Sequence, residues 1–166
     1  RELRSGDSET RVRLGDLFCV VPAITGKIEL VYEGEQEGPA LVARTLIKKA
    51  IRTVFPGLFP DPEQLKKQGA DQVYLPILDW FAEGNTLDLW HEAPEGEYAS
   101  QLALVPGLED LVNRYQPALV QENDLLLREF VLHALAEYSL LSKQQFDGRV
   151  NFRDLLGSMF RFDDDK

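Results

Sequence analysis

The stretch that most constrains the fold of this chain is residues 118–142, which contain neither glycine nor proline. Leucine, alanine, glutamate and arginine dominate it, and their side chains keep rotamer freedom in a helix. Its apolar residues recur at helical spacing: Leu119, Leu126, Leu127, Phe130, Val131, Ala134, Leu135, Tyr138 and Leu141. Leu125 and Leu132 widen this stripe, so we expect a largely buried central helix about 37 Å long. Asn123 or Asp124 would cap a later start.

Glycine and proline divide the rest of the chain into shorter elements. Residues 39–55 form the second strong helix prediction, because Pro39 suits a first helical turn and apolar residues follow it at helical spacing. That stripe consists of Val42, Ala43, Leu46, Ile47, Ala50, Ile51, Val54 and Phe55. Shorter helices are predicted at residues 17–21, 62–68, 75–83, 100–105, 108–115 and 152–160. Residues 27–32 and 86–90 alternate and predict two strands that pair as a hairpin, while residues 93–99 are predicted to be a polar loop.

These elements predict a mainly α-helical, bundle-like fold with at most one short β-hairpin, and an α+β fold is the alternative. A length of 166 residues is sufficient for one domain with its own core. We expect residues 1–14 to be a flexible charged segment, residues 15–160 a single helical domain, and residues 161–166 an acidic tail. Because the chain does not begin with methionine, we interpret its start either as a cut from a longer protein or as the boundary of an expressed fragment.

Composition limits the classes of partner. The chain carries 18 lysines and arginines against 28 aspartates and glutamates, a net charge of −10. Such a chain is repelled by nucleic acid and by anionic membranes, so neither is expected as a partner. No apolar run approaches the roughly 18 residues of a membrane span. Cys19 is the single cysteine, which excludes an internal disulfide and suits a cytoplasmic location.

Gly26 and Lys27 follow an apolar run, as the end of a phosphate-binding loop does. That loop also requires a glycine five residues before the first of them, and a serine or threonine after the lysine. Val21 and Ile28 occupy those positions, so the loop amides and the Mg²⁺ hydroxyl ligand would both be lacking. We therefore expect no catalytic, cofactor-binding or metal-binding residues for ATP chemistry in this chain.

Glu129, His133 and Glu137 lie four residues apart and would line one face of the central helix. This spacing supports an alternative function as a small metal- or ligand-binding enzyme, since carboxylates and imidazole are metal ligands. One helix leaves the coordination sphere incomplete, and local hydrogen bonding explains the same pattern. His91 lacks the second histidine of a zinc-protease helix, and Cys19 is predicted to lie in the core.

Two other groups of residues have a structural and a functional explanation. Trp80, Phe81 and Trp90 are either core residues or an aromatic surface for a protein partner, and the sequence leaves this open. The loop at residues 33–37 carries three glutamates, but it lacks the spacing of an EF-hand and suits a solvated turn.

One part of the chain resembles a known family. Residues 16–38 read DLFCVVPAITGKIELVYEGEQEG, and they are followed by a helix with the pattern AxxLIxxAxxxxFxxxF. The helix positions are Ala43, Leu46, Ile47, Ala50, Phe55 and Phe59. Residues 152–157 read FRDLLG and add a supporting match. In this order, the segments resemble the C-terminal region of AAA+ ATPases similar to the magnesium chelatase I subunit.

The resemblance implies a non-catalytic C-terminal domain, with the Walker A, Walker B and sensor segments upstream of Arg1. It implies ATP and Mg²⁺ as cofactors of the full-length protein only. It also implies partners: the upstream AAA+ core, neighbouring subunits of a ring homo-oligomer, and a protein with a von Willebrand factor A-type domain. None of the family's catalytic residues has a counterpart here, and a role in chlorophyll synthesis does not follow.

A nucleotide-binding measurement tests the sequence interpretation. We expect the isolated chain to bind neither ATP nor ADP and to hydrolyse no ATP, because the phosphate-loop positions hold Val21 and Ile28. Isothermal titration calorimetry with Mg²⁺-ATP would show only the heat of dilution. Saturable heat at millimolar nucleotide would contradict this reading of the sequence.

Overall fold

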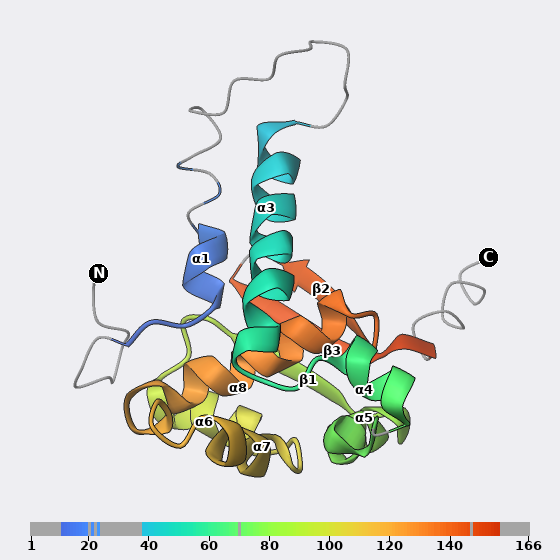
Figure 1. Ribbon diagram of the computed structural model, residues 1–166. Coiled ribbons are helices and arrows are strands. Elements are labelled where there is room, and N and C mark those ends of the chain that lie inside the picture. Colours follow the sequence, from blue (N-terminus) through green and yellow to red (C-terminus); the bar gives the residue numbers. More distant parts are fainter. Residues whose placement is uncertain are drawn as a thin grey trace, which may run out of the picture.

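The structure, a computed structural model, describes residues 11–19, 21, 23, 38–69, 71–146 and 148–156. Within these residues it is mainly α-helical with a small antiparallel sheet, which confirms the predicted class (Figure 1). The helices are α1 (Gly15–Cys19), α3 (Pro39–Val54), α4 (Pro62–Gln68), α5 (Leu75–Ala82), α6 (Glu95–Leu102), α7 (Leu108–Tyr115) and α8 (Val120–Glu137). Two 3-10 turns, η1 (Phe55–Gly57) and η2 (Asp71–Tyr74), precede α4 and α5. The strands are β1 (Thr86–Trp90), β2 (Leu141–Phe146) and β3 (Arg149–Asp154).

Helix α8 is the predicted central helix, and it crosses the middle of the molecule (Figure 1). It contacts α3, α6, α7 and β2, and every residue from Leu127 to Leu135 is buried. The helix is shorter than the predicted 118–142, because Ser139 has a φ of 57° and turns the chain out of the helical path. Leu141 therefore begins β2 instead of extending the helix. Asn123 has a non-helical φ of −128°, so a kink divides the first turn from the buried part.

The sheet has three antiparallel strands in the order β1-β3-β2. The predicted strand at 86–90 is confirmed, but it pairs with β3, and its expected partner at 27–32 lies outside the described residues. The helix predicted at 152–160 is wrong over residues 152–154, which belong to β3. Strand pairing on both sides of β3 buries Val150 and Phe152 on one face, and this tertiary context overrides local preference. The described sheet therefore has one strand more than the single hairpin that the sequence predicts.

Local signals locate several helices closely. α4 and α7 have the predicted bounds, and Asp61 caps α4 by accepting a hydrogen bond from the Glu63 N–H at 2.8 Å. The loop predicted at 93–99 is confirmed at residues 93–94 and wrong over residues 95–99, because α6 begins at Glu95. The helix ends at Leu102, before the end of the helix predicted at 100–105. This amphipathic helix buries only two side chains, which left a weak apolar pattern in the sequence.

The N-terminal part differs from expectation where it is described. Residues 1–14 were predicted to be flexible, yet Arg13 and Leu14 are buried. Helix α1 begins at Gly15, two residues before the predicted start at Leu17. Asp16 lies inside its first turn and accepts a hydrogen bond from the Arg13 N–H at 2.8 Å, so it is not the predicted N-cap. The side chain of Cys19, the loop at 33–37 and the tail at 161–166 lie outside the described residues.

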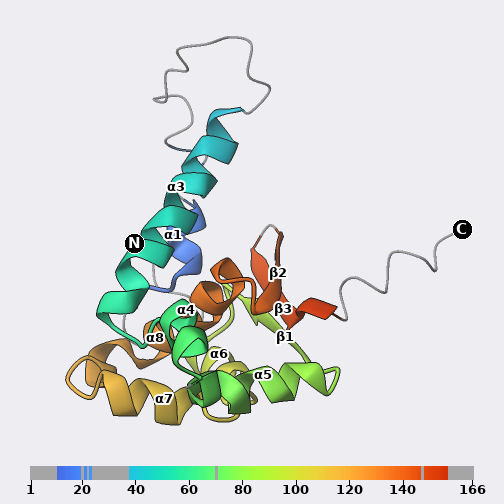
Figure 2. The same cartoon turned by 45° about the vertical axis from the view of Figure 1, so that its right-hand side comes forward.

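Helix α3 is anchored to the body of the protein at its C-terminal end only. Its N-terminal half stands clear of the other described helices and strands except α1, as two views show (Figures 1 and 2). At the anchored end, the Phe55 ring is fully buried and lies near four other aromatic rings. These belong to Phe59, Tyr74, Phe130 and Tyr138, with centroids 5.3–6.3 Å from Phe55. Tyr74 also donates a hydrogen bond to Pro60 O at 2.6 Å. Burial, its largest cause, raises the pKa of Tyr74 far above the ordinary value.

Phe55 is therefore the residue whose loss should most weaken the attachment of α3. We expect Phe55→Ala to lower the free energy of unfolding by about 3–5 kcal/mol, because it leaves a cavity among the aromatic rings. Phe146→Ala is the control, since that ring is 44% exposed, and it should cost less than about 1 kcal/mol. Urea unfolding followed by tryptophan fluorescence measures both. Equal losses for the two variants would contradict a core centred on Phe55.

Candidate functional site

The titratable residues of α8 lie in the interior of the protein. Glu129 and His133 are fully buried, one helical turn apart on the face that meets α1 and the sheet. The predicted spacing is therefore real, and it places a carboxylate and an imidazole where neither reaches solvent. Buried groups of this kind need hydrogen-bond partners. The structure supplies them for Glu129 Oε2 and His133 Nδ1, whereas Glu129 Oε1 and His133 Nε2 face each other at 3.6 Å, beyond hydrogen-bond distance.

Glu129 is tied to the N-terminal segment. Its Oε2 accepts a hydrogen bond from the Leu14 N–H at 2.7 Å, across 115 residues of sequence. Burial by itself raises the pKa of Glu129, but interactions with His133, the Leu14 N–H and the Tyr98 hydroxyl outweigh it and lower the pKa below the ordinary value. The carboxylate is thus a buried anion stabilised by groups from the segment just before α1, from α6 and from α8.

His133 lies between two aromatic rings and two polar groups. Its ring stacks on Phe18 at 5.5 Å and meets Phe152 edge-on at 5.1 Å. Its Nδ1 lies 3.1 Å from Lys143 Nζ, and its Nε2 lies 3.6 Å from Glu129 Oε1. Since an ammonium group can only donate, we assign Nδ1 as the acceptor and Nε2 as the protonated nitrogen facing Glu129. Burial first, and then Lys143, lower the pKa of His133, so the imidazole is neutral at pH 7.

Lys143 of β2 is the last member of a row of buried and half-buried polar side chains that also includes Glu129, His133 and Glu137, and that we call the polar chain. Its Nζ donates to Glu137 Oε1 at 2.7 Å while it contacts the His133 ring nitrogen. Burial lowers the pKa of Lys143, and the Glu137 carboxylate opposes that shift. The ammonium group therefore occupies the space between Glu137 and His133, where a metal ion bound by both would have to lie. The metal site suggested by the Glu129, His133 and Glu137 spacing does not fit this geometry, and no suitable cluster of ligands occurs among the described residues.

The Arg13 side chain joins the N-terminal segment to α6 and to the residues that follow β1, through hydrogen bonds and a contact with an aromatic ring. Its guanidinium donates to His91 O at 2.8 Å and to Ala93 O at 2.7 Å, and it lies 4.0 Å above the Tyr98 ring. Gly15 is required next to it, because a Cβ there would approach the His91 ring to 2.4 Å. Arg13 carried no distinguishing signal in the sequence, because its partners lie 78 and 80 residues away along the chain. Lys143 lies close to its partners in sequence but on a different element, so the helical spacing of α8 did not include it.

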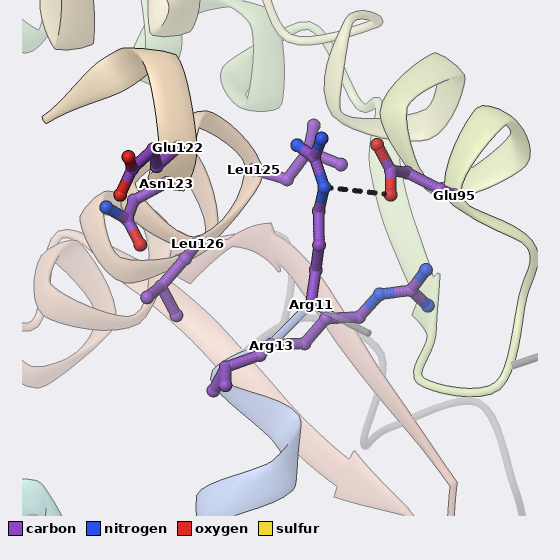
Figure 3. Close-up of a pocket in the computed structure, with 8 residues that line it drawn as sticks. Arg11, Arg13, Glu95, Glu122, Asn123, Leu125 and Leu126 are labelled. Atoms are coloured by element: carbon purple, nitrogen blue, oxygen red, sulfur yellow. Dashed lines mark ion pairs between the residues drawn. The ribbon is translucent and has the colours of Figure 1, made fainter. Parts of the chain in front are cut away.

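A small surface hollow follows the same segment. It has a volume of about 230 Å³ and is lined by Arg11, Val12, Arg13, Glu95, Glu122, Asn123, Leu125 and Leu126. Figure 3 shows Arg11 reaching toward Glu95, with an ion pair of 3.3 Å between them. The hollow therefore lies where residues 11–13 pass between α6 and α8, and its charges compensate one another.

A second hollow lies between α1, α3 and α8, and its lining is apolar throughout. Its volume is about 390 Å³, and its wall consists of Leu14, Leu17, Ile47, Ala50, Ile51, Val54 and Phe130. Leu17 and Val54 are 46% and 51% exposed, so the wall continues onto the surface. The predicted stripe of α3 is thus only half covered, since just Ala43 and Ile51 of α3 are buried among its described side chains.

The tryptophans differ in exposure. Trp80 is half-buried and meets Phe81 edge-on at 4.9 Å, which suits the core explanation. Trp90 is 49% exposed, and Arg149 lies between its ring and that of Phe146, at 5.1 Å and 4.7 Å. This row follows the pairing register of the three strands, so it stabilises the end of the sheet.

No protein family, curated protein or solved structure matches this chain in comparisons of all three kinds. None of the described helices has both the length and the apolar character needed to cross a bilayer. The functional interpretation therefore depends on the geometry above and on the sequence resemblance.

The depressed pKa values of the buried pair predict how stability depends on pH. The folded-state pKa of His133 lies below the unfolded value of 6.5, so the unfolded chain binds more protons as the pH falls below 6.5. Stability is then lost with a slope of up to about 1.4 kcal/mol per pH unit. The pKa of Glu129 is lowered from 4.5, so its contribution is lost in turn below that pH.

His133→Gln isolates the histidine contribution, because glutamine keeps an amide donor and acceptor but does not titrate. Urea unfolding at pH 7.5, 6.5 and 5.5 should show a loss on acidification in the original chain and a flatter profile in the variant. Two parallel profiles would show that His133 does not control stability in this range.

Proposed function

We propose that this chain is a non-catalytic, protein-docking C-terminal domain of a magnesium chelatase-like AAA+ ATPase. The observation that carries the proposal is the apolar face formed by α1 and α3, which the described part of the domain leaves exposed. Both helices lie in the segments that resemble the family, residues 16–38 and the helix that follows. A contiguous apolar face on an otherwise charged domain is typical of an interaction surface.

The resemblance positions on α3 fall into two groups. Ala43 is buried, and Phe55, in the η1 turn that follows α3, is buried and belongs to the hydrophobic core. Leu46 is 57% exposed, and Ala50 is exposed as well, although both belong to the same pattern. Folding of the described domain does not require apolar side chains at exposed positions, so a contact with another protein surface explains them better.

The buried polar chain supports a non-catalytic role. A reactive group has to reach a substrate, whereas Glu129 and His133 are fully buried and face each other. Glu137 and Lys143 form an ion pair at 2.7 Å, with side chains only 14% and 9% exposed. These residues are therefore explained as internal attachments between α1, α8 and β2.

The proposed partners follow from the resemblance. They are the AAA+ core upstream in the same protein, neighbouring subunits of a ring homo-oligomer, and a partner with a von Willebrand factor A-type domain or a client protein. ATP and Mg²⁺ would be bound by the upstream core, and the assembly would be cytoplasmic.

Two measurements test this proposal. The coding sequence upstream of Arg1 should contain a Walker A motif in the same reading frame. In that full-length protein, Leu46→Asp together with Val54→Asp should weaken assembly or partner binding at least about tenfold, as loss of an interface hot spot does. The thermal stability of the domain should be nearly unchanged, because both side chains are more than half exposed, at 57% and 51%.

Leu104→Asp provides the control, because Leu104 is 59% exposed but lies beyond α6, outside the α1–α3 face. It should leave assembly unchanged. An upstream sequence without a Walker A motif would refute the ATPase assignment, and equal effects of the two sets of substitutions would refute the docking face.

A further inference from the structure

We infer that the groove between α1 and α3 receives an acidic amphipathic helix from a partner protein. This inference rests on the proposed docking role and adds the chemistry of the partner. It draws on the charge of α3, which carries Arg44, Lys48, Lys49 and Arg52 and no acidic residue. In a chain with a net charge of −10, this helix is a positively charged element next to an apolar groove.

The size of the groove and the spacing of the apolar side chains beside it favour a helix as the occupant. The hollow of about 390 Å³ has room for apolar side chains of the size of leucine or phenylalanine. Leu46, Ala50 and Val54 follow one another at intervals of four residues, so they form a row along α3 beside the hollow. A row of this kind matches the apolar face of a second helix, which presents side chains at similar intervals.

The cations flank this row on both sides. Lys49 follows Leu46 by three residues, which places it next to the exposed apolar row. Arg44 and Lys48 precede Ile47 and Ile51 by three residues and flank the other edge of the groove.

Three of the four cations on α3 have no ion pair among the residues that the structure describes. Arg52 pairs with Glu63 and lies 4.8 Å above the Tyr138 ring. In contrast, no ion pair engages Arg44, Lys48 or Lys49 within the part of the chain that the structure describes. All three side chains are exposed. Carboxylates on the flanks of an incoming helix would supply the missing charges and favour association.

Two other occupants fit the groove less well. A symmetric contact with a second copy would place α3 against α3, and the exposed lysines would then face each other. An anionic bilayer presents a flat surface, whereas the apolar area between α1 and α3 is concave. Both remain as outcomes of the experiment.

The experiment uses two synthetic helical peptides that share leucines at positions i, i+3, i+4 and i+7. One carries glutamate at the flanking positions and the other lysine. Fluorescence anisotropy should show the acidic peptide binding at least about tenfold tighter than the basic one. Leu46→Ala with Val54→Ala should weaken the acidic peptide about tenfold, whereas Leu104→Ala should not. Lys48→Glu with Lys49→Glu should remove the preference for the acidic peptide.

A photo-crosslinking amino acid at position 46 of the full-length protein separates this inference from the docking role. Crosslinks to an acidic amphipathic segment, identified by mass spectrometry, would support both. Crosslinks to a neutral or basic protein segment would overturn the acidic partner and leave the docking role standing. Crosslinks between copies of this chain, binding of the chain to phosphatidylserine vesicles, or equal affinity for the two peptides would each overturn the inference. A complete lack of crosslinks would overturn both proposals.

Discussion

The hydrogen bond from the Leu14 N–H to the Glu129 carboxylate connects the N-terminal segment to the central helix α8. A buried carboxylate is costly unless donors surround it, and leaving a buried hydrogen-bonding group without its partner typically costs about 1–3 kcal/mol, and more when the group is charged. Here the donor comes from the N-terminal segment, 115 residues away, so the anion is satisfied only when that segment lies against α8. Arg13 adds bonds to two carbonyl groups beyond β1. The position of α1, and therefore of the groove beside α3, depends on these polar contacts as well as on apolar burial.

The same contacts explain why the charged residues of α8 are not reactive groups in this structure. Lys143 lies between His133 and Glu137, and its ammonium group supplies the positive charge that a bound cation would otherwise provide. The network extends from Leu14, just before α1, through α8 to β2. Its link to Leu14 spans 115 residues of sequence, whereas Lys143 lies only 6 and 10 residues from Glu137 and His133. The network fixes the packing of the elements against one another, which is a role that spacing along one helix cannot distinguish from metal binding.

The sequence was sufficient where local chemistry determines the structure. α4 and α7 have their predicted bounds, because a capping aspartate or a preceding Pro-Gly pair marks a helix start directly. It was insufficient for the pairing of β1 with β3, since Asp88 and Asn151 lie 63 positions apart. For the pairing of β2 with β3 a local signal was present, because Asp-Gly at positions 147–148 is a typical sequence for a two-residue hairpin loop, but the helical pattern of residues 118–142 and 152–160 outweighed it in the prediction. The candidate site shows the same division. The spacing of Glu129, His133 and Glu137 was visible in the sequence, whereas Lys143 and Arg13 reach it through the tertiary fold.

Helix α3 shows how the stability of the domain and its proposed docking role are distributed along one element. Its C-terminal end leads into the aromatic cluster around Phe55, so the helix stays attached whether or not a partner is present. Its exposed apolar residues contribute little to folding, because they remain in contact with water. Burying them against a partner would recover the hydrophobic free energy that folding leaves unused. A surface of this kind can change its partner without loss of the fold, because the core residues and the exposed row alternate along the same helix.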